Sequence, residues 1–191
     1  MSMAVLKNED SCDRWGGIRG LYACQVLMRI QNDLNVNLYR DFDLVVGTST
    51  GAIIAAALAY NIPLDQIARL YQEKGSVIFK RRKWSLGGFL FPRYSSAPLK
   101  SVLNDLFREA TLSETQSRLL IPATEISSGK MHIFRSSYHS NYARDRNVKI
   151  SDALLASCSA PLYFSPTRID AYLLSDGGLW ANNPSLLAIN E

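Results

Sequence analysis

The feature that most constrains this fold is a serine with a glycine two residues away on either side, Gly47-Thr48-Ser49-Thr50-Gly51. An apolar run precedes it at 42–46, and a run rich in Ala, Ile and Leu follows at 52–60. The pattern predicts a buried strand, a tight turn and a helix, with the serine on the turn. This is the nucleophile-elbow pattern, in which Gly47 and Gly51 let strand and helix approach closely and the helix N-terminus favours developing negative charge. A turn in which Ser or Thr merely caps the helix is the alternative.

Size and charge limit the classes of protein to which the chain can belong. Its 191 residues, 47% of them hydrophobic, fit a single domain over 1–191. The formal charge of +4 suits an anionic lipid surface but is too small to indicate a nucleic-acid polymer as partner. Three cysteines, Cys12, Cys24 and Cys158, have no metal-ligand spacing, so we expect reduced thiols in a cytoplasmic protein, with no metal and no cofactor. No secretion signal or membrane-spanning run is visible, so membrane contact is expected to be peripheral.

Strands are expected to alternate with helices along the chain. Residues 1–15 show no confident central strand, and a glycine-rich turn is expected at 15–20. The remaining expected helices run through 21–35, 63–75, 99–107 and 151–156, with a last one starting at 183–184; the remaining strands are 119–121, 131–134 and 171–174. The strands at 119–121 and 131–134 are expected to form a hairpin at a sheet edge. This order predicts an α/β three-layer sandwich with a largely parallel sheet, whose sites lie at the carboxyl ends of strands.

A serine nucleophile needs a base, and the chain offers few candidates. Its only histidines are His132, inside an expected strand, and His139, in a polar loop, and both are expected to be structural or solvated. Asp176 instead follows the last expected strand and precedes Gly177 and Gly178, which let the backbone bend sharply around a carboxylate. An ordinary Asx turn is the alternative for this aspartate.

The segment 76–96 departs from both helical and strand periodicity. Four cations lie between two aromatics at 79–84, and apolar residues without a period follow at 87–92. We expect a loop or lid here. It is either a solvated loop with anchoring aromatics or an interfacial patch, in which Lys and Arg meet lipid head groups while Trp84 and Phe89 dip beneath them.

Four stretches together resemble the patatin-like phospholipases. They are the elbow around Ser49, the turn Asp176-Gly177-Gly178 with 179–184 after it, the segment 156–164, and Gly16-Gly17-Ile18-Arg19-Gly20. Their order and spacing cover residues 16–191, and jointly they are far more specific than any one of them. The family continues beyond the Asp-Gly-Gly helix, so the chain is expected to be truncated at its C-terminus.

The resemblance implies a serine lipid acyl hydrolase of the phospholipase A type. Ser49 would attack an acyl ester of a membrane lipid, and Asp176 would accept its proton and later activate water. The glycine-rich loop would supply oxyanion donors from the backbone of Gly16, Gly17 and Ile18. Arg19 resembles the arginine beside this loop, where it would anchor the loop by hydrogen bonds.

One departure from the family pattern supports a second hypothesis. Arg14 and Trp15 stand where the family has Asp and the first Gly of the loop, and polar residues 7–14 replace an apolar strand. A catalytically impaired module that binds lipid or regulates another protein is therefore the alternative. A dinucleotide-binding domain, suggested by the glycines at 16, 17 and 20, is weaker because the first glycine of that motif is absent.

The run 70–79 is similar to a bacterial branch of patatin-like lipases that cyclic nucleotides activate. The resemblance implies a cyclic nucleotide as a further partner.

Overall fold

The computed structural model describes residues 12–81 and 92–191. Residues 1–11 and most of the basic and aromatic segment, including Trp84 and Phe89, lie outside the described residues, as do the expectations attached to them.

The sheet is mixed, with β2 at its centre. Its strands are β1 (Leu44–Val46), β2 (Arg118–Glu125), β3 (Lys130–Arg135), β4 (Thr167–Ile169) and β5 (Tyr172–Asp176). Among the described strands only β1 and β2 pair in parallel, whereas β2–β3, β2–β5 and β4–β5 are antiparallel. The sheet is thus less parallel than expected, because two hairpins supply four of its strands. The β2–β3 hairpin is confirmed at a sheet edge, because β3 pairs with β2 alone among the described strands, whereas β2 pairs with three strands.

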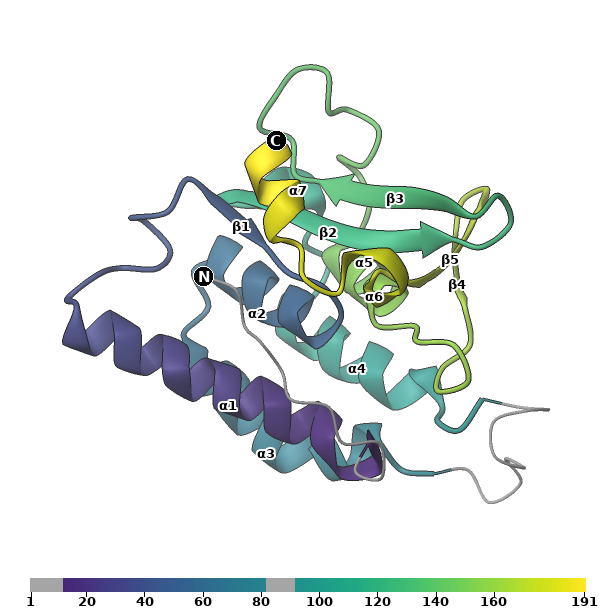
Figure 1. Cartoon of the computed structure of the whole chain (residues 1–191), viewed down its shortest axis with the longest axis horizontal. Coiled ribbons are helices and arrows are strands. Elements are labelled where there is room, and N and C mark those ends of the chain that lie inside the picture. The colour runs from purple at the N-terminus through teal and green to yellow at the C-terminus, as the bar shows by residue number, and fades with distance from the viewer. Residues whose placement is uncertain (1–11, 82–91) are drawn as a thin grey trace.

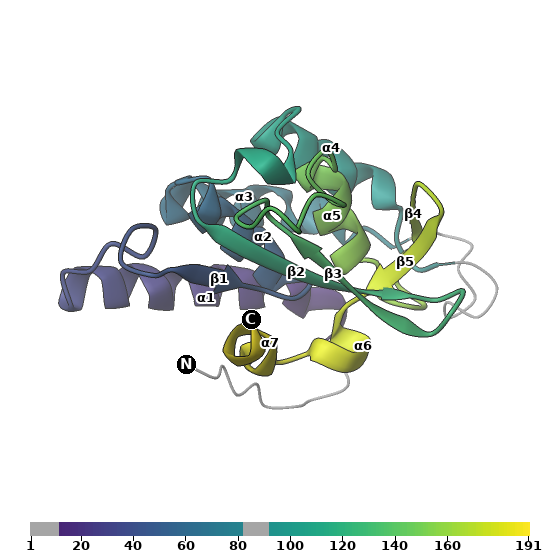
Figure 2. The same cartoon turned by 90° about the horizontal axis from the view of Figure 1, so that it is seen from above.

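Helices cover both sides of the sheet. Figure 2 shows α6 and α7 on one side of the β2–β3 ribbon and α2, α4 and α5 on the other, while α1 lies along α3 (Figure 1). The helices are α1 (Cys12–Asp33), α2 (Thr50–Ala59), α3 (Leu64–Ile78), α4 (Ser96–Phe107), α5 (Ile150–Ser157), α6 (Gly178–Ala181) and α7 (Ser185–Asn190), with a 3₁₀ turn at Leu112–Glu114. This is the expected α/β sandwich of helices on a sheet.

Two apolar clusters hold these layers together. The larger lies between the sheet and α2, α4 and α5, and includes the fully buried Leu119, Ile121 and Leu154. The smaller joins α1, α2 and α3 around Ile67 and Tyr71. Because α2 is apolar on all sides, it contributes to both clusters and is buried between them.

Several local expectations are corrected by the structure. The glycine-rich turn expected at 15–20 belongs to α1, which is helical from Cys12. Gly75 does not end α3, which continues to Ile78. Lys149, and not Ser151, precedes α5, and the buried hydroxyl of Ser151 has no hydrogen-bond partner among the described residues. Propensity alone misplaces such ends because packing decides where a helix stops.

None of the helices in the described part of the chain combines the length and the apolar character needed to cross a bilayer.

Candidate active site

Ser49 lies on the turn between β1 and α2, in a backbone conformation that side-chain-bearing residues rarely adopt. Its φ is 56° and its ψ is −126°. Such a conformation costs on the order of 1–3 kcal/mol and persists only where the surroundings enforce it. The side chain makes no capping bond to α2. The alternative of a simple helix cap is therefore not what the structure shows, and the hydroxyl is directed elsewhere.

The two glycines of the elbow have different structural roles. A Cβ on Gly47 would lie 2.2 Å from the carbonyl oxygen of Gly51, so the strand end and the first turn of α2 touch backbone to backbone. A Cβ on Gly51 would meet nothing within 4 Å. Close approach therefore requires glycine at 47 only.

Asp176 ends β5 and faces the serine. The Ser49 hydroxyl donates to Asp176 Oδ2 at 2.7 Å, while the Gly178 amide donates to Oδ1 at 2.6 Å. A Cβ on Gly177 would lie 2.2 Å from the Pro122 carbonyl oxygen, and one on Gly178 would lie 2.9 Å from Asp176 Oδ1. The two glycines thus let the turn fold tightly around the carboxylate, which leaves one oxygen for Ser49.

Burial and hydrogen bonding act in opposite directions on the pKa of the Asp176 carboxylate. Asp176 is only 6% exposed, and burial raises its pKa, while the hydrogen bonds from the Gly178 amide and the Ser49 hydroxyl oppose this rise. A raised pKa makes a carboxylate a better proton acceptor. The neighbouring Cys158 thiol contacts Ser49, and burial, followed by the charge of Asp176, raises its pKa, so it stays neutral. Of these two groups, it is the Ser49 hydroxyl that donates a hydrogen bond to the Asp176 carboxylate.

Residues without a role assigned from the sequence hold the surrounding backbone. The Ser49 amide donates to Ser157 Oγ at 3.1 Å, and Ser157 Oγ donates to the Pro122 carbonyl at 2.7 Å. The Thr48 hydroxyl donates to the carbonyl of Ala181 in α6 at 2.6 Å. Ser157 was not singled out from the sequence, although it lies in the segment 156–164 that carried the family resemblance, which is the signal that could have found it.

Neither histidine is joined to Ser49 or Asp176 by any hydrogen bond of the described residues. His132 is 5% exposed in β3, its ring lies edge-on to Phe134 and Tyr172, and burial lowers its pKa. His139 Nδ1 accepts a hydrogen bond from the Asn141 amide. The described contacts of both histidines are therefore with residues other than Ser49 and Asp176.

The structure places the expected oxyanion residues within α1. Gly16, Gly17 and Ile18 are helical, so in this conformation their amides follow the helical hydrogen-bond pattern. The Arg19 side chain is exposed and forms no hydrogen bond or ion pair with other described residues. Gly20 packs directly on α3, where a Cβ would lie 2.5 Å from the Tyr71 ring. Gly20 is thus explained by helix packing, and the oxyanion role of the other three stays a prediction.

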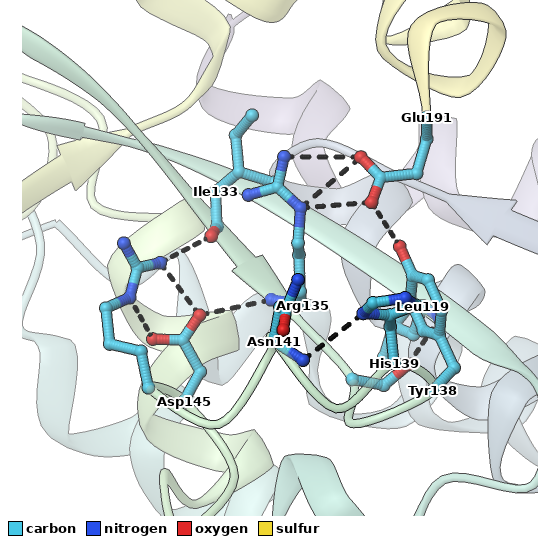
Figure 3. A network of polar contacts seen from close by, with 10 residues as sticks. Leu119, Ile133, Arg135, Tyr138, His139, Asn141, Asp145 and Glu191 are labelled. Carbon is cyan, nitrogen blue, oxygen red and sulfur yellow. Dashed lines mark hydrogen bonds and ion pairs between the residues drawn. The ribbon is translucent and has the colours of Figure 1, made fainter.

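A second polar network fixes the end of α7 on the sheet (Figure 3). The carboxylate of Glu191 accepts from Arg135 of β3 at 3.1 Å and from the Tyr138 hydroxyl. Asp145 accepts from the Arg135 amide and pairs with Arg144 at 2.7 Å. No hydrogen bond or ion pair of the described residues links this network to Ser49 or Asp176.

Comparisons with known proteins agree with this geometry. A family model described as patatin-like phospholipase matches residues 16–189. A cGAMP-activated phospholipase of Pseudomonas aeruginosa is 37% identical over 92% of this chain and 54% of its own length. A cUMP-AMP-activated phospholipase of Escherichia coli is 35% identical over 92% of this chain and 56% of its own.

A solved structure shares the fold at low sequence identity. VipD from Legionella pneumophila has a TM-score of 0.62 at 12% identity, over 86% of this chain and 44% of that one. This chain spans about half the length of the curated relatives above. The family match over nearly all of the chain, on a fold that joins the elbow serine to an Asp-Gly-Gly aspartate, shows that the chain belongs to the patatin-like phospholipase family.

Proposed function

We propose that this domain hydrolyses fatty-acyl esters of membrane lipids through a dyad of Ser49 and Asp176. The observation that carries the proposal is the 2.7 Å hydrogen bond from Ser49 Oγ to Asp176 Oδ2 at a strained elbow. As Ser49 attacks the ester carbonyl, its proton passes to Asp176 and then to the leaving alcohol, which leaves an acyl-enzyme. Asp176 then takes a proton from a water molecule that attacks the acyl carbon, and it passes this proton to Ser49 Oγ as the bond between Oγ and the acyl carbon breaks and the fatty acid leaves.

Stabilisation of the oxyanion requires backbone amides that are free to donate to it. Gly16, Gly17 and Ile18 are the proposed donors, yet amides inside a helix donate to carbonyls four residues earlier. Their participation therefore requires the first turns of α1 to open. Removal of one oxyanion donor lowers kcat by about 100- to 1000-fold in other hydrolases, so this requirement decides how active the chain is.

The helical state of residues 16–18 favours a second candidate function, a lipid-binding or regulatory module that has lost turnover. Fatty-acid release from vesicles of phosphatidylcholine and phosphatidylglycerol, compared between the wild type and Ser49→Ala, separates the two. Release by the wild type and loss of release in Ser49→Ala supports the enzyme. Salt-sensitive vesicle binding without any release that depends on Ser49 supports the binding module.

Contact with the lipid surface is proposed to be peripheral and to involve exposed apolar side chains near the dyad. Leu179 is 57% exposed and lies three residues after Asp176, within about 10 Å by chain length. Leu162 is 60% exposed and lies four residues after Cys158, within about 14 Å. Its φ of 69° shows that the chain holds this leucine in an unfavourable backbone conformation.

The relatives' names lead us to propose a cyclic-nucleotide activator as well. The two bacterial phospholipases are named for activation by cGAMP and cUMP-AMP, and this chain covers about half of each. Fatty-acid release should therefore rise when either nucleotide is added to the protein. Unchanged release with both would remove the activator from the proposal.

A further inference from the structure

The backbone of Ser49 needs support that the elbow itself does not provide. Its φ of 56° lies in the left-handed region, which residues with a Cβ avoid. Its hydroxyl is engaged by Asp176, and it forms no side-chain cap on α2. Its carbonyl accepts a hydrogen bond from the Ala52 amide at 2.9 Å. The remaining polar group is its own amide, so whatever accepts the amide hydrogen helps to set the position of Oγ.

That acceptor is the hydroxyl of Ser157, at the end of α5. The side chain is fully buried at 0% exposure. Its single hydrogen is given to the Pro122 carbonyl at 2.7 Å, so only lone pairs remain for the Ser49 amide at 3.1 Å. Both bonds are satisfied only in one orientation of the hydroxyl. The direction of the bond to Ser49 is therefore fixed.

The Pro122 carbonyl also touches the turn that carries the base. Pro122 lies between the part of β2 that pairs with β1 and the part that pairs with β5. Gly177, directly after Asp176, approaches the same carbonyl so closely that a Cβ would lie 2.2 Å from its oxygen. Ser157 thus ties the nucleophile's amide to an atom against which the base turn is packed.

We propose that Ser157 is a positioning residue that sets the distance between Ser49 Oγ and Asp176. The proposal rests on the dyad proposed above. In this proposal the Ser157 hydroxyl does more than satisfy the Ser49 amide and the Pro122 carbonyl, because it also sets the position of Ser49 Oγ. The same bond engages the Ser49 amide, so this amide does not serve as an oxyanion donor.

The test compares Ser157→Ala with Ser136→Ala as a matched control. Ser136 is also a buried serine, 1% exposed, and accepts a backbone amide, that of Leu119, at 2.9 Å. Both variants lose a buried hydroxyl that accepts one amide, so a purely structural role predicts lower thermal stability and unchanged turnover in both. The proposal predicts that Ser157→Ala alone lowers kcat and the rate of fluorophosphonate labelling by about 10- to 100-fold, with KM unchanged.

Ser157→Cys, which keeps a weak donor and acceptor of similar size, should give an intermediate kcat, and it replaces Ser157→Ala if that variant does not fold. Wild-type kcat in the folded Ser157 variants, or a change in KM alone, would overturn the proposal. Hydrogen exchange of the Ser49 amide gives a readout that needs no turnover. Even if the wild type releases no fatty acid, faster exchange in Ser157→Ala than in Ser136→Ala supports the bond from the Ser49 amide to Ser157 on which the positioning depends, and equal exchange refutes the proposal.

Discussion

The contact between Gly47 and Gly51 permits a test in which two neighbouring glycines give opposite results. In Gly47→Ala the new Cβ would lie 2.2 Å from the Gly51 carbonyl oxygen, whereas Cβ contacts below 3.0 Å are essentially never seen. The strand end and the helix must therefore separate by about 0.8 Å, the difference between these distances. Ser49 lies between the two glycines, so a shift of this size would stretch its 2.7 Å bond to Asp176 beyond hydrogen-bonding distance.

The size of the effect follows from this geometry. Overpacking of this kind costs about 1–3 kcal/mol. For a domain of this length that lowers Tm by about 2–12 °C. Misplacement of a reacting group by nearly 1 Å lowers turnover by about 100-fold. In Gly51→Ala the Cβ enters open space at the start of α2, where Ala stabilises a helix by about 0.5–1 kcal/mol relative to Gly.

Thermal unfolding and fluorophosphonate labelling of both variants check the prediction. Gly47→Ala should melt earlier and label slowly, while Gly51→Ala should melt at or above the wild-type temperature and still label. Equal melting temperatures for the two variants would refute the packing argument. A normal labelling rate in a destabilised Gly47→Ala would instead show that the elbow tolerates the shift.

Three further predictions concern the carboxylates and the surface. Asp176→Asn should abolish fatty-acid release yet raise Tm at neutral pH. Burial raises the pKa of Asp176, so at a pH above the ordinary pKa of an aspartate its ionised form destabilises the folded state. A lower Tm, or retained release, would contradict this. Burial raises the pKa of Glu191, but the hydrogen bonds from Arg135, Tyr138 and Tyr142 together with the charge of Arg135 lower it further than burial raises it. Glu191→Gln should therefore lower Tm at neutral pH, and the difference from the wild type should vanish as acid protonates Glu191; a pH-independent difference would be the contrary result. Leu162→Ser with Leu179→Ser should weaken vesicle binding in a flotation assay and leave hydrolysis of a soluble ester unchanged, whereas equal loss of both would indicate damage to the dyad.

The elbow and the Asp-Gly-Gly turn could be predicted from the sequence because each is a local pattern. An apolar run, a glycine and a small-residue helix leave few ways to place Ser49, and the structure has β1, the turn and α2 where they were expected. The β2–β3 hairpin was predictable for the same reason, since two apolar runs lie on either side of a short turn. The dyad itself came from the family resemblance, since nothing local links residues 49 and 176.

The first turns of α1 show where local pattern fails. Glycines at 16, 17 and 20 favour a turn, but the chain is helical there. The contact with Tyr71 of α3 explains Gly20. A Cβ at this position would collide with the Tyr71 ring, so a glycine is needed for α1 and α3 to pack this closely. A glycine required by packing and a glycine required by a turn look the same in a sequence.

The sequence by itself determined the strand–turn–helix unit that presents Ser49, because this unit depends on residues adjacent in the chain. Only the tertiary structure decided that Asp176 lies 2.7 Å from Ser49 and that Ser157 and Pro122 hold the elbow. It also decided that β2 lies at the centre of a mixed sheet. These are contacts between segments far apart in the chain, and their distances follow from strand pairing and core packing, which no local pattern specifies.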